Sequence, residues 1–491
     1  MPLKFNPEKR QRLLIGSLFW LLCLVTHPAD AQITGFQHIV LIVQENRTPD
    51  NLFFSLCATV SCSTTPDDEQ YNIQTSNWLD KNVPGGTINP APVQLANEYD
   101  TRHEHPDFVA MCDRDPTGRG GCKMDGAGDI GCAGTWTGLP HTPCPPNAEF
   151  RYVDNSTGIL DPYLDLATSY GWANYMFQTN QGPSFPAHQF LFGATSAPSA
   201  DDDHAGTFAA ENVRDETMDA GCTAPPGTAV QLIDAQGYEN RKNRIYPCFE
   251  HDTIADLLDA ASVSWRYYSP LPGGIWTAPN AIDHICKPHD EKCKGSLWRA
   301  NVDIAPSDVL VDIGNCALRQ VSWVIPTGQR SDHAGQNAGD GPAWVASIVN
   351  AIGNSPCHNA DNSTYWDSTA IIITWDDWGG WYDHEPPKFL DYPEGGYQMG
   401  FRVPLIFVSA YTPQGYINNG RLDFGTIARF IENNFGIPEG ALTFADARGP
   451  GHLADFFNLS ATPRTFQTIP APKDAAFFIH DKTPPTPPDD D

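Results

Sequence analysis

The chain has 491 residues, of which 41% are hydrophobic and 18% are charged, and its formal net charge at pH 7 is −29. This composition excludes an intrinsically disordered chain and suits one large globular domain or two smaller ones. Because like charges repel, the acidic balance argues against nucleic acid as a partner and allows at most transient membrane contact, whereas a small phosphate ester is compatible if a metal cation dominates the field of its site.

The first 32 residues have the pattern of a cleavable secretory signal. Four basic residues precede an apolar run at 13–26, and small residues follow at 29–31. The run is shorter than the ~20 residues that span a bilayer, so an uncleaved anchor is the weaker alternative. We therefore expect a secreted or periplasmic protein. At the other end, residues 476–491 have the composition of a disordered, acidic and Pro-rich tail.

Twelve of the thirteen cysteines follow the leader. An even number of cysteines in an exported chain predicts disulfides, although most pairings stay open. Cys57 and Cys62 are close enough in sequence to close a small loop, and so are Cys286 and Cys293. The cysteines within 112–144 include no CxxC pair, so a structural zinc site is disfavoured.

Strand and helix patterns alternate along the chain. Apolar runs of strand length occur at 39–43, 263–268, 321–325, 370–375 and 403–409. Helical spacing occurs at 160–178, 187–195, 251–261, 343–352 and 426–435. The polar stretches 57–150 and 197–247 have the composition of loop insertions, and the first is rich in cysteine. The alternation implies βαβ crossovers, and hence an α/β fold with a mostly parallel central sheet covered on both faces.

Two of the predicted strands end in groups of polar residues. Glu45 and Asn46 follow the first strand, and Asp376 and Asp377 follow the strand at 370–375. The carboxyl ends of parallel strands form one edge of a sheet, where ligands bind. Oxygen ligands of this kind suit a divalent cation such as Mg²⁺, Ca²⁺, Mn²⁺ or Zn²⁺. The alternative is that these residues only cap turns after the strands.

Ser184 lies between Pro183 and Phe185, just before a predicted helix. Helix amides at such a position attract anions, and a serine beside a divalent cation can become a nucleophile. The plainer alternative is a serine that caps the helix.

Four histidines lie in polar loops near predicted strand ends. Side chains of this type could bind phosphoryl oxygens or protonate a leaving alkoxide, although a single loop histidine is usually an ordinary surface residue. The four are His103, His105, His333 and His384.

Several motifs together resemble a known family, the secreted phosphoesterases that include bacterial and plant non-specific phospholipases C and a group of bacterial acid phosphatases. The resemblance extends over residues 36–475, and the motifs occur in the order typical of the family. They are HIVLIVQENRTPDNLF at 38–53, RHEH and GCKMDG within 102–126, GPSFPAHQFLFGATS at 182–196, SWVIPTGQRSDH at 322–333, ITWDDWGGWYDHEPP at 373–387 and RVPLIFVSA at 402–410.

This resemblance implies one phosphoesterase domain over 33–475 with an alkaline-phosphatase-like three-layer sandwich. It also implies a divalent metal cofactor and a serine nucleophile that forms a phosphoserine intermediate, with a histidine that protonates the departing alcohol. His105 matches the family less cleanly, so its participation stays open. The residues that match the family's site are Glu45, Asn46, Asp376 and Asp377 as metal ligands, Ser184 as nucleophile, and His103, His333 and His384 as active-site histidines.

The chain departs from the family at the nucleophile. Many phospholipases C read GPTWPNR there, whereas this chain has Ser184 in place of threonine and Ala187-His188 in place of Asn-Arg. The substrate therefore stays open between a small phosphate ester and a phospholipid head group. We expect phospholipase C-type hydrolysis of phosphodiesters; the alternatives are an acid phosphatase acting on monoesters and a non-catalytic exported binding protein. A sulfatase is disfavoured, because His188 occupies the arginine position of its Cys/Ser-x-Pro-x-Arg motif.

Overall fold

The structure, a computed structural model, describes residues 35–486 except 115–120, 134–142, 214–218 and 389–398. The expected secretory signal at 1–32 lies outside the described residues. Within the described part, no helix combines the length and apolar character that a membrane crossing requires.

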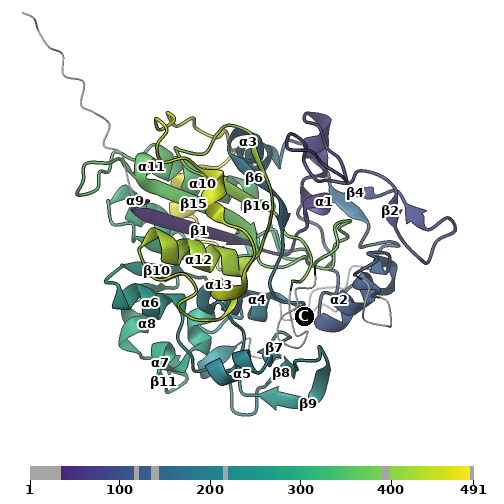
Figure 1. Cartoon of the computed structure of the whole chain (residues 1–491), viewed down its shortest axis with the longest axis horizontal. Helices are drawn as coiled ribbons and strands as arrows, with labels where there is room; N and C mark the ends of the chain where they lie inside the picture. Colours follow the sequence, from purple (N-terminus) through teal and green to yellow (C-terminus); the bar gives the residue numbers. More distant parts are fainter. Residues whose placement is uncertain (1–34, 115–120, 134–142, 214–218, 389–398, 487–491) are drawn as a thin grey trace, which may run out of the picture.

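An eight-stranded sheet forms the centre of the protein (Figure 1). One strand runs antiparallel to both of its neighbours, and every other neighbouring pair is parallel. The prediction of an α/β fold with a mostly parallel sheet is therefore confirmed. In spatial order the strands are β13 (Val302–Asp303), β10 (Trp265–Tyr268), β14 (Val321–Val324), β1 (His38–Gln44), β15 (Thr369–Trp375), the antiparallel β16 (Leu405–Val408), β6 (Gly171–Met176) and β17 (Tyr416–Leu422).

Two adjacent strands at the centre of the sheet, β1 and β15, come from parts of the sequence that lie far apart. In Figure 1 the purple β1 lies beside the green β15. Every residue of both strands is buried, which explains why each is a nearly continuous run of β-branched and other apolar residues. They pair in parallel register from His38 opposite Thr369 to Gln44 opposite Trp375. The residues that follow the two strands therefore emerge side by side.

Helices pack on the sheet in two groups, which gives the three layers that we expect. The first group surrounds α10 and includes α3, α9 and α14, whereas the second surrounds α12 and includes α4 and α6. Strand β16 contacts both groups, since Phe407 packs against Phe430 of α12 while α3 also lies against the strand. The helices are α3 (Asp161–Ser169), α4 (Ser184–Gly193), α6 (Ile254–Ala260), α9 (Asp308–Gly314), α10 (Gly341–Gly353), α12 (Phe424–Asn434) and α14 (Ala475–His480).

One predicted helix, at 160–178, was wrong in its second half. The helical part ends with α3, and the chain then enters the buried strand β6, whose Trp172 is fully buried. An apolar run of this length is compatible with either structure, and here the sheet provides hydrogen-bonding neighbours on both sides, β16 and β17. The strand β17 was not predicted, because its sequence YINNGRL lacks an apolar run.

The C-terminal segment also differs from the expectation of a disordered tail from residue 476. Helix α14 crosses this boundary, and Phe478 is fully buried against Trp344. Arg330 pairs with Asp481 at 3.0 Å. The part of the tail up to residue 486 is thus packed on the domain, and the last five residues lie outside the described ones.

Six disulfides use all twelve cysteines of the described chain. The two short loops predicted from spacing, Cys57–Cys62 and Cys286–Cys293, are confirmed. Two more disulfides lie in the first insertion, so the cysteines within 112–144 are paired with each other. The other disulfides are Cys112–Cys122, Cys132–Cys144, Cys222–Cys248 and Cys316–Cys357.

Candidate active site

The four acidic and amide residues that follow β1 and β15 meet at the carboxyl edge of the sheet. Glu45, Asn46, Asp376 and Asp377 are all fully buried. The backbone N–H of Asn46 donates to Asp376 Oδ1 at 3.0 Å. Gly379 turns the chain back with φ +61°, and a Cβ there would lie 2.5 Å from the Asn46 carbonyl oxygen, so only glycine allows this close approach. The register of the two strands thus brings together Asn46 and Asp376, which lie 330 positions apart in the sequence.

Ser184 joins this group from a third strand end. It is the first residue of α4, which follows the carboxyl end of β6, and it is 1% exposed. Its hydroxyl donates to Asp377 Oδ2 at 3.2 Å. The next backbone N–H, that of Phe185, donates to Asn212 Oδ1 at 2.9 Å, which holds the start of the helix in place. The hydroxyl is therefore held against the carboxylates.

His188 belongs to the same group, although it was not among the predicted site residues. Its Nε2 lies 3.4 Å from Glu45 Oε1 and 3.7 Å from Asp376 Oδ2. Burial lowers the pKa of His188 to about 4, so the imidazole is neutral near pH 7 and has a lone pair to offer. The missed signal was its spacing: residues four apart on a helix share a face, and His188 is four residues after Ser184.

These residues fit a divalent cation. Both carboxylate oxygens of Glu45, Oδ1 of Asn46, Oδ2 of Asp376 and Nε2 of His188 have no hydrogen-bond partner in the described structure. Burial and then the charge of Asp376 raise the pKa of Glu45 well above its usual range, and the same two causes raise that of Asp377. Unpartnered buried carboxylates are costly, and a cation would satisfy them. Three oxygen donors and one imidazole suit Mn²⁺, Zn²⁺ or Mg²⁺.

Two of the predicted histidines meet at Asn46. The Asn46 amide Nδ2 lies 3.1 Å from His103 Nε2 and 3.0 Å from His333 Nε2. In each ring, Nδ1 lies 2.8 Å from a backbone carbonyl oxygen, of Thr101 and Ala334 respectively, which requires the proton on Nδ1. Each Nε2 is then an acceptor, and the amide donates to both. The histidines thus bind the Nδ2 side of the amide, and Asn46 Oδ1 has no hydrogen-bond partner in the described structure.

His384 lies in a different buried group. Its Nδ1 is 2.7 Å from Asp50 Oδ2, and its Nε2 is 2.8 Å from Asn72 Oδ1. Arg402 bonds both Asp50, at 3.3 Å, and Asp383, at 2.9 Å. Asp50, Asp383 and His384 are close enough to hold an ion, but the guanidinium already neutralises the two carboxylates. The structure therefore brings His103 and His333 to Asn46 in the candidate site. It places His384 in the separate group around Asp50 and Arg402.

His105, whose role stayed open, begins helix α2 (His105–Cys112). Its Nδ1 lies 2.8 Å from the carbonyl oxygen of Gln181, and its backbone N–H donates to Glu211 Oε1 at 3.1 Å. These contacts fasten the first insertion to the segment just before Ser184. They assign His105 a place beside the site, apart from the carboxylate group.

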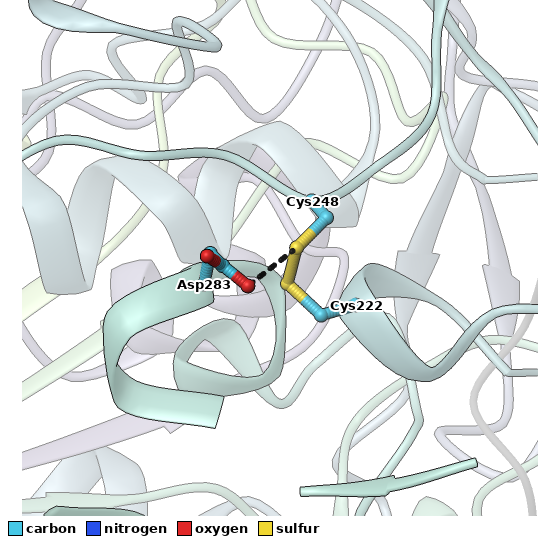
Figure 2. A group of neighbouring side chains, drawn as sticks. All are labelled: Cys222, Cys248 and Asp283. Atoms are coloured by element: carbon cyan, nitrogen blue, oxygen red, sulfur yellow. Dashed lines mark hydrogen bonds between the residues drawn. A yellow bond between two sulfur atoms is a disulfide. The ribbon is translucent and has the colours of Figure 1, made fainter. Parts of the chain in front are cut away.

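A third group with the composition of a metal site is a disulfide. Figure 2 shows that Cys222 and Cys248 are bonded to each other, with a carboxylate oxygen of Asp283 lying 3.8 Å from the Cys248 sulfur. A metal ligand must be a thiolate, and these sulfurs carry none. Among the described residues, the group of Glu45, Asp376 and His188 is thus the candidate that still lacks a counter-charge.

Comparison with known proteins identifies the family of the chain. The model of the phosphoesterase family matches residues 36–438. Phospholipase C B of Mycobacterium tuberculosis (strain ATCC 25618 / H37Rv) is 23% identical over 462 residues, which cover 89% of this chain and 80% of that protein. Non-specific phospholipase C1 of Arabidopsis thaliana is 24% identical over 46% of this chain and 43% of its own length. A solved protein of the alkaline phosphatase superfamily from Vibrio parahaemolyticus gives a TM-score of 0.26 with 11% identity, over 74% of this chain and 69% of that chain; a score this low does not establish a shared fold.

Proposed function

The chain belongs to the phosphoesterase family, and on that premise we propose that it hydrolyses phosphoric esters with a bound divalent cation and with Ser184 as its nucleophile. The observation that carries the proposal is the Ser184 hydroxyl, which lies 3.2 Å from Asp377 beside buried ligand atoms that have no partner. Glu45, Asn46, Asp376 and His188 would hold the cation, and Asp377 is the remaining predicted ligand on the side of the serine. When bound, the cation would favour ionisation of the hydroxyl and stabilise charge on the phosphoryl group.

The residues of the chain divide the reaction into two displacements. Ser184 Oγ attacks phosphorus, a serine–phosphorus ester forms, and the bond to the alcohol breaks. The serine proton passes first to Asp377, which accepts its hydrogen bond and whose pKa burial and Asp376 raise. His103 or His333, once protonated, supplies the proton that the departing alkoxide needs. In the second displacement water attacks phosphorus and gives one proton to that histidine, while the serine–phosphorus bond breaks and Asp377 returns its proton to Ser184.

We propose that the substrate is a phosphodiester of the phospholipase C type. The support is that phospholipases C align over most of the chain. Phosphomonoesters are the alternative substrate, since the chain departs from the phospholipase pattern around His188. Six disulfides are typical of proteins from an oxidising compartment, which supports export.

Removal of metal is expected to abolish hydrolysis. Purified protein treated with a chelator should lose at least ~100-fold of its rate on a chromogenic phosphodiester, because the cation contributes several kcal/mol to the transition state. Adding back Mn²⁺, Zn²⁺ or Mg²⁺ separately should restore the rate and identify the ion. A matched phosphomonoester assayed in parallel decides between phospholipase C and phosphatase.

Hydrolysis that survives complete metal removal would overturn the metal dependence. Folded, metal-loaded protein that hydrolyses neither ester would instead indicate a binding protein.

His384 and His333 are expected to respond differently to substitution. His384→Gln should lower the free energy of unfolding by about 1–3 kcal/mol, because it breaks a buried bond to Asp50, but should change kcat by less than ~10-fold. The matched variant His333→Gln should lower kcat by about 100-fold or more. Thermal melting and steady-state hydrolysis measured on both proteins check this. A large loss of kcat in stable His384→Gln protein would return His384 to the catalytic residues.

A further inference from the structure

Trp276 lies where the two parts of the candidate site meet. It comes from the loop after β10, at the same edge of the sheet as Ser184 and the carboxylates. Its ring centroid is 6.5 Å from that of His188 in the carboxylate group and 6.1 Å from that of His333 beside Asn46. The Tyr267 hydroxyl donates to its backbone carbonyl oxygen at 2.7 Å. The residue is 1% exposed, so its ring is packed in place near both histidines.

The indole N–H of Trp276 has no partner in the described structure. Among the other buried tryptophans of the described part, Trp172 donates to Asn174 and Trp375 donates to Asp332. Trp344, Trp378 and Trp381 also leave this donor without a partner. An unused buried donor lowers stability, so a donor left open beside the candidate site needs an explanation. An indole N–H donates only and cannot ligate a cation. Because Trp276 lies beside His188 and His333, a phosphate ester bound at this site would offer the acceptor that the protein itself does not provide.

We propose that the indole N–H of Trp276 donates a hydrogen bond to a phosphoryl oxygen of the bound ester. The proposal rests on the proposed function, which brings a phosphoryl group to Ser184. Charge gathers on the phosphoryl oxygens as Ser184 attacks, and a fixed, buried donor stabilises that charge more than it stabilises the ground state. Trp276 is then a catalytic residue that contacts the reacting group, and the rings of His188 and His333 pack near its own.

The chain offers a matched control for this test. Trp344, in α10, is also fully buried and also has an indole N–H without a partner. Its ring packs against Phe478 of α14 and against the guanidinium of Arg330. These neighbours do not belong to the carboxylate group. Replacing either tryptophan with phenylalanine keeps an aromatic ring and removes the donor. Only the change at position 276 should affect the reaction.

Trp276→Phe is expected to lower kcat about 100–1,000-fold with a KM within ~3-fold of wild type, because one donor to a developing oxyanion contributes on this order. Its affinity for vanadate, which imitates the transferring phosphoryl group, should fall by a similar factor. Its metal content should stay unchanged. Trp344→Phe should leave kcat and vanadate affinity within ~2-fold of wild type. Trp276→His, which restores an N–H donor, should recover part of the lost vanadate affinity and provides a second variant if the phenylalanine form folds poorly.

Equal effects of Trp276→Phe and Trp344→Phe on kcat and vanadate binding would overturn the proposal. Loss of bound metal in Trp276→Phe would also overturn it, because the tryptophan would then support the ligands and not the substrate. These outcomes differ from a failure of the proposed function, in which the wild-type protein itself would hydrolyse neither ester.

Discussion

Ser184→Ala is expected to lower kcat by at least ~10³-fold, since removal of a nucleophile leaves only the contribution of binding and electrostatic stabilisation. The variant should still fold, because it loses a single hydrogen bond from a neutral hydroxyl to Asp377. Such a bond contributes about 1 kcal/mol to the free energy of unfolding. Steady-state hydrolysis of the preferred ester, with metal content and melting temperature measured on the same samples, checks this result. In a rapid-quench experiment the wild type should release the alcohol before the product that carries the phosphoryl group, which is a phosphomonoester when the substrate is a diester. The variant should show no such burst.

Ser322 provides the control for this substitution. It is a fully buried serine in β14, and its hydroxyl, unlike that of Ser184, has no hydrogen-bond partner in the described structure. Ser322→Ala should therefore keep its kcat close to wild type. If Ser184→Ala, with its metal in place, retained more than a tenth of the wild-type rate, attack by water would replace attack by serine in the mechanism.

Glu45→Gln is expected to have opposite effects on stability with and without metal. With metal, the variant should lose activity by about 10³-fold or more, because one of the charged ligands becomes neutral. In chelator, it should be more stable than wild type by about 1–3 kcal/mol, because the buried carboxylate repels Asp376 and neither of its oxygens has a partner. Melting curves of both proteins in excess metal and in chelator check the crossover.

The stability gain in chelator should grow with pH. Burial raises the pKa of Glu45 above its unfolded value, so the ionised group destabilises the folded state, and this effect increases as pH rises from about 4.5 toward the folded pKa. The difference between variant and wild type should be small at pH 4.5 and larger at pH 8. Glu432→Gln is the control: this buried carboxylate accepts backbone N–H groups of Gly440 and Ala441, so its effect should not depend on metal. Equal stability of Glu45→Gln and wild type in chelator at every pH would argue against the crowded carboxylate group.

Much of the fold was predictable because buried parallel strands leave a strong local signal. In β1 and β15 both faces are covered, so each strand is an apolar run that ends sharply in polar residues. That pattern predicted Glu45, Asn46 and Asp376 at one edge of the sheet. It failed where no local signal exists, as in β17, whose Asn-Asn-Gly stretch becomes a strand only because β6 offers it an edge.

The sequence by itself determined the α/β class, the two short disulfide loops and the residues that meet at the strand ends, because these follow from patterns within a few neighbouring residues. Only the tertiary structure decided which histidines join them. His188 reaches Glu45 because α4 begins at the edge of the sheet. His384, seven residues after Asp377, binds Asp50 instead. Arg402 fixes that outcome by neutralising Asp50 and Asp383, whereas the carboxylates around His188 have no such cation from the chain. Contacts between residues hundreds of positions apart set these charges, and no local pattern in the sequence encodes them.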